Sequence, residues 1–560
     1  MTVTAQSIVE KAAPPDEWCR CPGCGAFLYW KRLHRNAKVC PECQHHLRMS
    51  LDERLAHVLD PDSFVPLGPT QEPVDVLAFV DSQPYPRRLA TAARRTGRPE
   101  AATYGVGAIQ GARLAVVALD FGFMGGSIGA VVGEAVVQAA ELARIERIPL
   151  LVICASGGAR MQEGALALMQ LARTAQEIAR LHEEGVLVIN LNTHPTFGGA
   201  TASFATLGDV VLAEPGSLIG FAGPQVIRQT IRQELPAGFQ TAEFLQEHGM
   251  VDLVVPRDHL RETIGRIIRL HGPSPRVPAG PASPAVTDPA ALTRAPAWDV
   301  VGRARHLARP TTLDYLRHAF EDFVELHGDR AYRDDAALVA GVARLAGRHV
   351  VVVGHQKGHD TAELVRRNFG MPHPEGYRKA LRMMRHAARF GLPLVTFVDT
   401  PGAFPGLEAE ERGQGTIIAE CIAEMSRLPV PAVSVVTGEG GSGGALALAV
   451  ADRVLMLEHS YYSVISPEGC STILWGSAAS AASAAQALRL TAPDLLRLGV
   501  VDAVVPEPAG GAHADPPATA AAVARAVTSC LDELAGRSAA ELVEQRYQRF
   551  RTLGPAGVIA

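Results

Sequence analysis

The sequence predicts an α/β protein built from two similar tandem domains, preceded by a small ribbon that holds four cysteines. Short runs such as LLVIC, VLVINL, LVTFV and AVSVV are apolar throughout, as strands covered on both faces of a sheet are. These runs alternate with helical patterns in both halves of the chain, which is typical of repeated βα units. Two pairs of closely spaced cysteines stand apart near the N-terminus.

Length and composition limit the class of protein. The chain has 560 residues, too many for one core, so several domains are expected. Its formal net charge of −5 argues against general nucleic-acid binding. No run of about twenty apolar residues predicts a membrane span, and the first 17 residues do not form a signal peptide. Cysteines outside the N-terminal cluster are scattered in apolar surroundings, so we expect a reducing, cytoplasmic location.

The N-terminal cysteines have the spacing of a metal site. Cys21, Cys24, Cys40 and Cys43 form C-x2-C, fifteen residues, then C-x2-C. Two such turns can direct four thiolates at one tetrahedral zinc ion. We therefore predict a zinc ribbon over residues 18–50 with one structural Zn²⁺. Two disulfides are the alternative, which fits poorly with a cytosolic chain that carries the additional thiol of Cys19.

A proline-rich segment divides the rest of the chain. Residues 271–298 contain seven prolines and little that could enter a core, so they predict an exposed, semi-rigid linker. The predicted organisation is therefore a disordered N-terminus (1–17), the ribbon (18–50), a first domain (51–270), the linker (271–298) and a second domain (299–560).

The two large domains resemble each other. Pro149 and Pro393 precede similar apolar strands at an offset of 244, and Gly198 and Gly443 lie in similar glycine-rich turns at an offset of 245. Two matched pairs in register indicate an internal duplication.

Glycines interrupt each domain where a strand ends and a helix begins. A nucleophile elbow would read G-x-S-x-G, but Cys154 occupies the place of the first glycine in CASGG. A phosphate loop would require a lysine and a hydroxyl, which GEGGSGGALAL lacks. Close helix packing is a third explanation. The fourth, which explains the recurrence, is that main-chain N–H groups at the helix starts face a developing negative charge, as in an oxyanion hole.

Longer sequence segments in both domains indicate a resemblance to a known family. Residues 18–270 contain DFGFMGGSIGAVVGE, ASGGARMQEG and GDVVLAEPGSLIGFAGPQVI, and residues 299–555 contain GHQKGHDTAELVRRNFGMPHPEGYRKALRMM, DTPGAFPGLEAEERGQ and SVISPEGCSTILW. These phrases resemble the carboxyltransferase component of bacterial-type acetyl-CoA carboxylase. Its beta and alpha subunits, usually separate, are fused here with beta first. The long helical segment that usually opens the alpha subunit is missing, which leaves its part in assembly open.

The resemblance implies a fold and a reaction. The fold would be two tandem crotonase-like (ClpP/crotonase) ββα-spiral domains. The reaction would move the carboxyl group of carboxybiotin, delivered in trans on a carrier protein, to acetyl-CoA, giving malonyl-CoA for fatty acid biosynthesis. Biotin freed of its CO2 can itself accept the α-proton, which would explain the lack of an evident side-chain base.

The resemblance also implies the site residues and the partners. The catalytic amides would belong to Gly157, Gly158, Gly198 and Gly199 on the acyl-CoA side and to Gly402, Gly443 and Gly444 on the biotin side. Arg160 could bind CoA or have a structural role. Lys357 could likewise contact a ligand or have a structural role. The expected partners are a biotin carboxyl carrier protein, a biotin carboxylase and at least a second copy of this chain, without membrane or nucleic acid.

Three alternatives remain. The chain could transfer carboxyl groups to propionyl-CoA or another acyl-CoA, since one methyl group changes selectivity by only about 1–3 kcal/mol. It could be an RNA-binding zinc-ribbon protein with degenerate enzyme halves. It could also be a crotonase-like hydratase or hydrolase, for which Glu163 is the candidate base. Four arginines that no motif explains cluster before the first glycine turn: Arg87, Arg88, Arg94 and Arg95.

Overall fold

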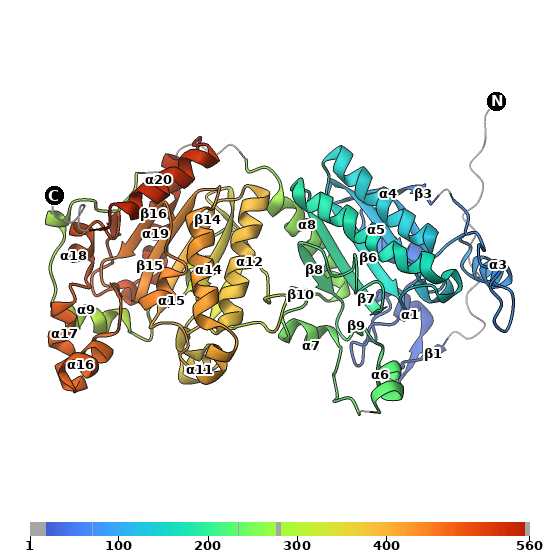
Figure 1. The fold of residues 1–560 in the computed structure, drawn as a ribbon, viewed down its shortest axis with the longest axis horizontal. Coiled ribbons are helices and arrows are strands. Elements are labelled where there is room, and N and C mark those ends of the chain that lie inside the picture. The colour runs from blue at the N-terminus through green and yellow to red at the C-terminus, as the bar shows by residue number, and fades with distance from the viewer. Residues whose placement is uncertain (1–17, 70, 233, 276–281, 555–560) are drawn as a thin grey trace.

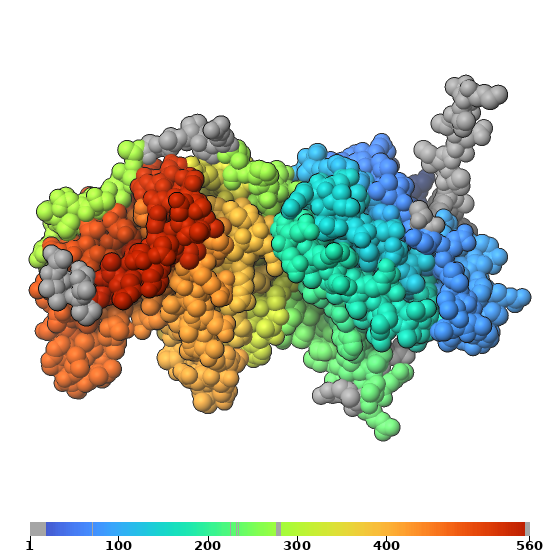
Figure 2. Space-filling model, turned by 45° about the horizontal axis from the view of Figure 1, so that its top comes forward, coloured from blue at the N-terminus to red at the C-terminus, as the bar shows by residue number. Residues whose placement is uncertain are grey.

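A computed structural model describes residues 18–69, 71–232, 234–275 and 282–554. It consists of two α/β halves side by side, with the ribbon against the outer part of the first half (Figures 1 and 2). We call residues 51–271 the N-terminal half and residues 284–554 the C-terminal half. The expected disordered N-terminus and part of the predicted linker lie outside the described residues.

The ribbon and the N-terminal half contain ten strands and eight α-helices among the described residues. The strands are β1 (Trp18–Arg20), β2 (Phe27–Tyr29), β3 (Val65–Gly68), β4 (Ala102–Ile109), β5 (Ala112–Leu119), β6 (Leu150–Ser156), β7 (Val188–Phe197), β8 (Val210–Ala213), β9 (Ile219–Gly220) and β10 (Leu253–Val254). The helices are α1 (Trp30–Arg35), α2 (Leu51–Val58), α3 (Tyr85–Thr96), α4 (Ala130–Glu146), α5 (Gly164–Glu183), α6 (Pro224–Ile231), α7 (Ala242–Glu247) and α8 (Leu260–His271).

The C-terminal half repeats this pattern with a longer helical tail. Its strands are β11 (Asp322–Glu325), β12 (Leu338–Leu345), β13 (Arg348–His355), β14 (Leu394–Thr400), β15 (Ala432–Gly441), β16 (Arg453–Leu457), β17 (Tyr461–Ser463) and β18 (Ala503–Val505). Its helices are α9 (Ala297–Ala304), α10 (Thr312–Ala319), α11 (Thr361–Arg366), α12 (Pro374–Phe390), α13 (Leu407–Glu411), α14 (Gln414–Ser426), α15 (Ser442–Leu446), α16 (Pro467–Trp475), α17 (Ala481–Ala487), α18 (Ala492–Arg497), α19 (Pro516–Leu534) and α20 (Ala539–Arg551).

The two main sheets have the same topology. The first has the order β10-β8-β7-β6-β5-β4-β3, and the second has the order β11-β12-β13-β14-β15-β16-β18. In each sheet, antiparallel pairing at one edge gives way to parallel pairing, with β5 beside β6 and β13 beside β14. The continuously apolar strands are buried as predicted, because helices cover the sheets (Figure 1).

Corresponding elements of the halves keep a constant offset. The seventeen-residue helices α4 and α12 begin 244 residues apart, as do β6 and β14, and β7 and β15. The register between neighbouring strands shifts at Cys154 in one half and at Val398 in the other, again 244 residues apart. The pairing of Gly198 with Gly443 at an offset of 245 was therefore wrong by one residue. Gly198 corresponds to Ser442, and both have a left-handed backbone, with φ of 62° and 55°.

The halves share one hydrophobic core. A single cluster of buried side chains includes Leu151 and Ile264 from the first half with Val351 and Leu381 from the second. Helix α8 provides much of this contact, because its buried face packs against β12 and β13. Buried Asp252 adds ion pairs to Arg330 and Arg382 across the same boundary.

Part of the predicted linker is packed rather than exposed. Val286 pairs with Val504 of β18 through two backbone hydrogen bonds, of 2.7 and 2.9 Å. The partly buried side chain of Leu292 packs against the shared core. In the part of the chain that is described, none of the helices is both long and apolar enough to cross a membrane.

Candidate functional site

Each half contains a sharp turn where its central parallel strand ends. After β6 the chain turns at Gly157 and Gly158, and after β14 it turns at Pro401 and Gly402. Gly158 has φ of 112° and Gly402 has φ of 152°, a region of backbone conformation that favours glycine.

A hydroxyl group holds each turn. Ser156 Oγ accepts the N–H of Gly158 at 3.1 Å and donates to the carbonyl of Gly126 at 2.7 Å. Thr400 Oγ1 accepts the N–H of Gly402 at 3.0 Å and donates to the carbonyl of that residue at 2.7 Å. Both hydroxyls are therefore part of the turn, which argues against a serine nucleophile.

Several of the predicted glycine N–H groups are already used within the protein. Gly157 donates to the carbonyl of Gly125 at 2.8 Å, and Gly198 donates to the carbonyl of Phe221 at 2.9 Å. Together with Gly158 and Gly402, these N–H groups shape the turns and are not free to hold a ligand oxygen.

Two neighbouring N–H groups of the N-terminal half have no acceptor among the described residues, those of Ala159 and Gly199. The two segments approach closely, because a Cβ on Gly199 would lie 3.2 Å from the nitrogen of Ala159. A Cβ on Gly158 would lie 3.2 Å from the nitrogen of Gly199. The glycines thus allow two unbonded donors to lie side by side.

The C-terminal half repeats this arrangement. The N–H groups of Ala403, Gly443 and Gly444 find no acceptor in the described part of the chain. The two glycines lie in the first turn of α15, where backbone donors have no partner within the helix. A Cβ on Gly444 would lie 2.5 Å from the nitrogen of Ala403 and 2.7 Å from the hydroxyl oxygen of Tyr377, so only glycine fits there.

The side chain of Arg160 is enclosed within the protein. Its guanidinium is completely buried and pairs with Glu100 at 2.5 Å and Glu163 at 3.2 Å. It also donates to the hydroxyl of Tyr85 at 3.0 Å and to the carbonyl of Ser127 at 2.8 Å. These contacts leave no donor of Arg160 for CoA. They favour a structural role, in which Arg160 holds the turn after β6.

Glu163, the candidate base of a hydratase or hydrolase, belongs to the same buried network. Its two oxygens accept hydrogen bonds of 2.6 Å from the hydroxyl of Tyr85 and from the N–H of Ala130. Because both oxygens are engaged and the side chain is buried, Glu163 is not placed to remove a proton from a substrate.

Lys357 has a comparable role in the C-terminal half. Its ammonium group pairs with Asp399 at 2.8 Å and with Glu439 at 2.6 Å. Arg305 also pairs with Glu439, at 2.7 Å. Burial alone would raise the pKa of Glu439, but the charges of Lys357 and Arg305 outweigh burial and lower it to about 2. This network ties the ends of β13, β14 and β15 together beneath the Gly402 turn.

A cavity adjoins each turn. The cavity in the N-terminal half has a volume of about 440 Å³ and is lined by Gly157, Ala159 and residues of α3. The cavity in the C-terminal half has a volume of about 330 Å³ and is lined by Pro401, Lys357 and Glu439. No described residue lines both cavities, so the two turns of one chain do not open into a common space.

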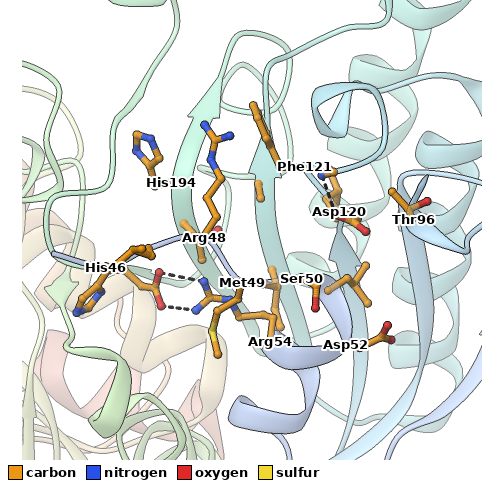
Figure 3. A pocket seen from close by; sticks show the side chains of 18 of the residues that line it. His46, Arg48, Met49, Ser50, Asp52, Arg54, Thr96, Asp120, Phe121 and His194 are labelled. Atoms are coloured by element: carbon orange, nitrogen blue, oxygen red, sulfur yellow. Dashed lines mark hydrogen bonds and ion pairs between the residues drawn. The ribbon is translucent and has the colours of Figure 1, made fainter. Parts of the chain in front are cut away.

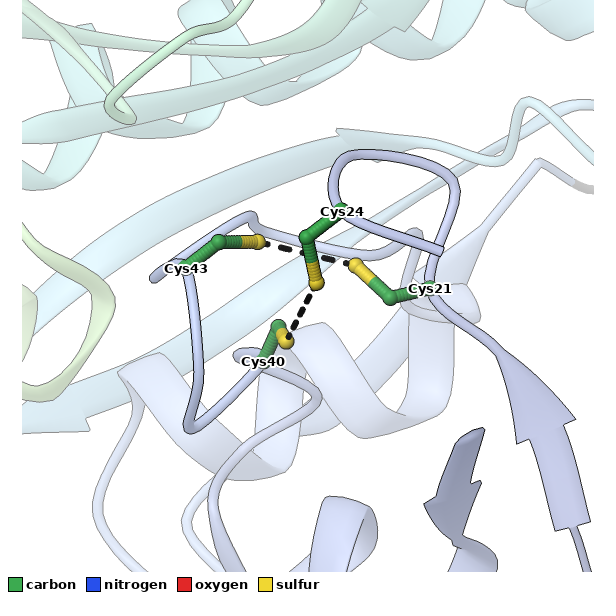
Figure 4. Close-up of side chains that lie close together, drawn as sticks. All are labelled: Cys21, Cys24, Cys40 and Cys43. Atoms are coloured by element: carbon green, nitrogen blue, oxygen red, sulfur yellow. Dashed lines mark hydrogen bonds between the residues drawn. The ribbon is translucent and has the colours of Figure 1, made fainter. Parts of the chain in front are cut away.

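The four predicted zinc ligands meet in the ribbon (Figure 4). Their sulfur atoms lie within 4.8 Å of one another, with 3.7 Å between Cys21 and Cys43 and 3.9 Å between Cys24 and Cys40. A tetrahedral zinc with Zn–S bonds of about 2.3 Å requires sulfurs about 3.8 Å apart, so the residues fit this ion.

An arginine of the N-terminal half anchors the ribbon. Arg257 is buried, pairs with Glu214 at 2.7 Å and donates to the ribbon carbonyls of Ala37 and Leu47 at 2.7 and 3.1 Å. Arg54 also pairs with Glu214. A cavity of about 530 Å³ lies beside this contact, between the ribbon and the first sheet (Figure 3).

Sequence reasoning missed Ala159 and Ala403, whose N–H groups are unbonded. The signal was present, because the two alanines follow the glycine turns at the same offset of 244 as Ser156 and Thr400. It was overlooked because an alanine has no feature that marks its backbone as functional.

Two family models match separate parts of the chain. The model described as "Acetyl-CoA carboxylase zinc finger domain" matches residues 18–43. The model described as "Acetyl co-enzyme A carboxylase carboxyltransferase-like" matches residues 290–554.

Curated relatives match nearly the whole chain. "Acetyl-coenzyme A carboxylase carboxyl transferase subunits beta/alpha" of Saccharopolyspora erythraea is 61% identical over 96% of this chain and 94% of its own length. The protein of the same name from Clostridium tetani is 41% identical over 98% of this chain and 95% of its own. The "subunit alpha" of Thermus thermophilus is 63% identical over 46% of this chain and 81% of its own.

Solved structures share the fold. A transcarboxylase 12S structure, described as a hexamer with methylmalonyl-coenzyme A bound, superposes with a TM-score of 0.70 at 22% identity, over 90% of this chain and 92% of its own. A single-chain, multi-domain long-chain acyl-CoA carboxylase gives 0.66 at 19% identity, over 88% of this chain and 46% of its own. With the four-cysteine ribbon, these likenesses confirm the predicted pair of tandem crotonase-like domains.

Proposed function

The chain belongs to the family of acetyl-coenzyme A carboxylase carboxyl transferases in which the beta and alpha subunits are fused, and we propose that it converts acetyl-CoA to malonyl-CoA. The carboxyl donor would be carboxybiotin on a separate carrier protein. The observation that carries this proposal is the presence of unbonded main-chain donors at equivalent turns of both halves. Such donors stabilise oxyanions, and this reaction develops negative charge on two carbonyl oxygens.

In the N-terminal half, the N–H groups of Ala159 and Gly199 would hold the thioester oxygen of acetyl-CoA. Loss of the α-proton places negative charge on that oxygen, and two fixed donors stabilise the enolate more than the neutral thioester. Gly157, Gly158 and Gly198 would act through the turn geometry, since their N–H groups are already bonded.

In the C-terminal half, the N–H groups of Ala403 and of Gly443 or Gly444 would hold the ureido oxygen of biotin. Carboxybiotin supplies the CO2 when its bond from N1 to the carboxyl carbon breaks. The amides stabilise the charge left on the ureido group, which can then accept the α-proton, and the enolate carbon forms the new bond to CO2. Gly402 would shape this turn, because its own N–H is bonded to Thr400.

We infer that two copies of the chain build each complete site. The two turns of one chain adjoin separate cavities, and an exposed apolar side chain lines each of them, Met161 in the first and Phe369 in the second. On α5, the side chains of Leu168 and Met169 are 55% and 50% exposed, and on α16 that of Ile473 is 72% exposed. A second copy that placed its C-terminal half over α5 would bury such surfaces and bring the two kinds of turn together.

The ribbon would hold one structural zinc ion. Four thiolates leave no coordination position for a substrate, so zinc would supply folding energy and no chemistry. We expect metal analysis to give one zinc per chain, and Cys40→Ser to lose zinc and to unfold the ribbon with little effect on the C-terminal half. A Cys40→Ser chain that retains zinc and ribbon structure would contradict this role.

The reverse reaction tests the proposed activity. The purified chain should transfer the carboxyl group of malonyl-CoA to biocytin and release acetyl-CoA, and it should need a carrier protein and a biotin carboxylase only for the ATP-driven forward cycle. Acetyl-CoA formation that does not depend on biocytin would contradict the proposal. Relative rates with acetyl-, propionyl- and butyryl-CoA in the forward direction test the alternative acyl acceptors.

A further inference from the structure

The cavity between the ribbon and the first sheet has the character of an anion site. Its wall contains four arginines, Arg48, Arg54, Arg95 and Arg257, together with His46, His194 and the ring of Phe121. Arg48 lies near the end of the ribbon and extends into the cavity between His194 and Phe121 (Figure 3). Arg95 lies in the last turn of α3 and lines the same cavity.

Two of the four arginines have no carboxylate partner. Arg54 and Arg257 share the single carboxylate of Glu214, so this trio keeps a net charge of +1. Neither Arg48 nor Arg95 forms an ion pair within the described residues; Arg95 donates to the carbonyl of Gly122, and Arg48 stacks 4.2 Å from the ring centre of Phe121.

Two carboxylates besides that of Glu214 line the same wall. Asp52 pairs with Arg98, outside the cavity, and Asp120 accepts the N–H of Gly122 at 2.7 Å. Four arginines thus face three carboxylates, and the charge of one of these, Asp52, is cancelled by Arg98, so the wall of the cavity keeps a net positive charge, which suits a phosphate.

The cavity adjoins the proposed thioester site. Gly125 and Arg95 line both this cavity and the one that contains Ala159. The carbonyl of Gly125 also accepts the N–H of Gly157, so the loop between the two cavities is bonded directly to the glycine turn. A long ligand could thus have one end at the turn and the other between Arg48 and Arg95.

We propose that Arg48 and Arg95 bind the phosphate groups of the acyl-CoA, while its pantetheine arm passes Gly125 to the amides of Ala159 and Gly199. This assignment rests on the proposed function, because it takes the substrate to be a CoA thioester. It also gives a role to part of the arginine cluster before the glycine turn, and it makes the ribbon part of the wall of the substrate site.

The test compares a substrate that carries the phosphates with one that lacks them. We would measure the biocytin-dependent reaction of the full-length zinc-loaded chain with malonyl-CoA and with malonyl-pantetheine. Arg48→Gln and Arg95→Gln should each raise the KM for malonyl-CoA about 10–100-fold, because each removes a charge-assisted contact. The kcat for malonyl-CoA and both constants for malonyl-pantetheine should change by less than about twofold.

Arg94→Gln is the matched control. Arg94 precedes Arg95 on α3, is exposed, lines neither cavity and bonds only to Thr91 among the described residues. It should leave the KM for malonyl-CoA unchanged. An equal loss with both thioesters, or an unchanged KM for malonyl-CoA in the double variant Arg48→Gln/Arg95→Gln, would overturn the assignment.

A binding measurement separates this inference from the proposed function. Calorimetric titration of CoA and of pantetheine needs no catalysis, and the double variant should weaken only the binding of CoA. A wild-type chain that binds CoA but does not act on malonyl-CoA would refute the proposed activity and leave the arginine site standing. A wild-type chain that binds CoA and pantetheine equally well would refute the arginine site.

Discussion

The glycine turns of the two halves have the same backbone but different supports. Ser156 and Thr400, at equivalent positions, accept the N–H of a glycine two residues later. Beneath the first turn lies the buried pair of Arg160 and Glu100, and beneath the second lies the pairing of Lys357 with Asp399 and Glu439. Duplication thus preserved the positions of the main-chain donors, while the side chains that hold them diverged.

A second difference concerns the size of the side chains that pack near the two turns. The position of Tyr377 on α12 corresponds to Gly133 on α4, and Gly444 corresponds to Ala200. In the C-terminal half a large side chain faces a glycine, whereas in the N-terminal half both residues are small and the side chain of Gln170 lies next to Gly133. The same backbone spacing therefore depends on different side-chain volumes in the two halves, as close packing requires.

Removal of the buried cation beneath either turn should lower the stability of the chain more than any other change described below. The loss should be larger for the cation of the N-terminal half. Arg160→Met leaves Glu100 buried without its partner and should destabilise the chain by about 3–5 kcal/mol. Lys357→Met should destabilise it by less, because Arg305 still pairs with Glu439. Thermal and urea unfolding measure both. If Lys357→Met lowers the free energy of unfolding more than Arg160→Met does, the predicted order of the two buried cations is wrong.

Obstruction of the second turn should have the next largest effect. Gly444→Ala places a Cβ 2.5 Å from the nitrogen of Ala403 and should lower kcat for transfer to biocytin about 10²–10³-fold, with affinity for CoA retained. Gly199→Ala should lower kcat by a smaller factor, because the added Cβ would lie 3.1 Å from Cδ1 of Leu171 and 3.2 Å from the nitrogen of Ala159.

Gly415→Ala is the matched control for these variants, because no atom lies within 4 Å of its Cβ position. It should leave the reaction unchanged. If Gly444→Ala weakens binding of CoA as much as it lowers kcat, the assignment of biotin to the C-terminal half is wrong.

Protonation of Glu439 at low pH should weaken its ion pairs beneath the second turn, and the resulting loss of stability should be smaller than the effects above. The pKa of Glu439 is lowered from 4.5 to about 2, so its contribution to stability is complete above pH 4.5 and is lost as the pH falls toward 2. The contribution is at most about 3 kcal/mol. The difference in Tm between wild type and Glu439→Gln should be largest at pH 7 and shrink below pH 4.5; a difference that grows on acidification would contradict this origin.

The smallest effect should come from an exposed ion pair between the halves. Arg333 and Glu247 lie 3.1 Å apart with side chains 55% and 64% exposed, so Arg333→Ala should destabilise the chain by less than about 1 kcal/mol. Asp252→Asn, which changes the buried pairs with Arg330 and Arg382, should cost several times more. Equal effects on Tm would show that the halves are held together by surface charge.

The local patterns of the sequence were sufficient for several features. The cysteine spacing predicted the cluster in which Cys21 and Cys43 meet, and the apolar runs predicted the buried strands β6 and β14. The glycines marked the turns after those strands, because few other residues adopt the backbone that Gly158 and Gly402 have.

Sequence by itself determined the fold class, the duplication and the places where strands break, because these follow from local periodicity and from the conformational range of single residues. Only the tertiary structure decided which N–H groups are free. Gly157 and Ala159 are close neighbours in sequence, but the first donates to a carbonyl more than thirty residues away in the chain and the second does not. It also placed Arg160 in the core and left Arg48 and Arg95 without a carboxylate partner among the described residues, because burial and pairing depend on residues that are distant in sequence and close in space.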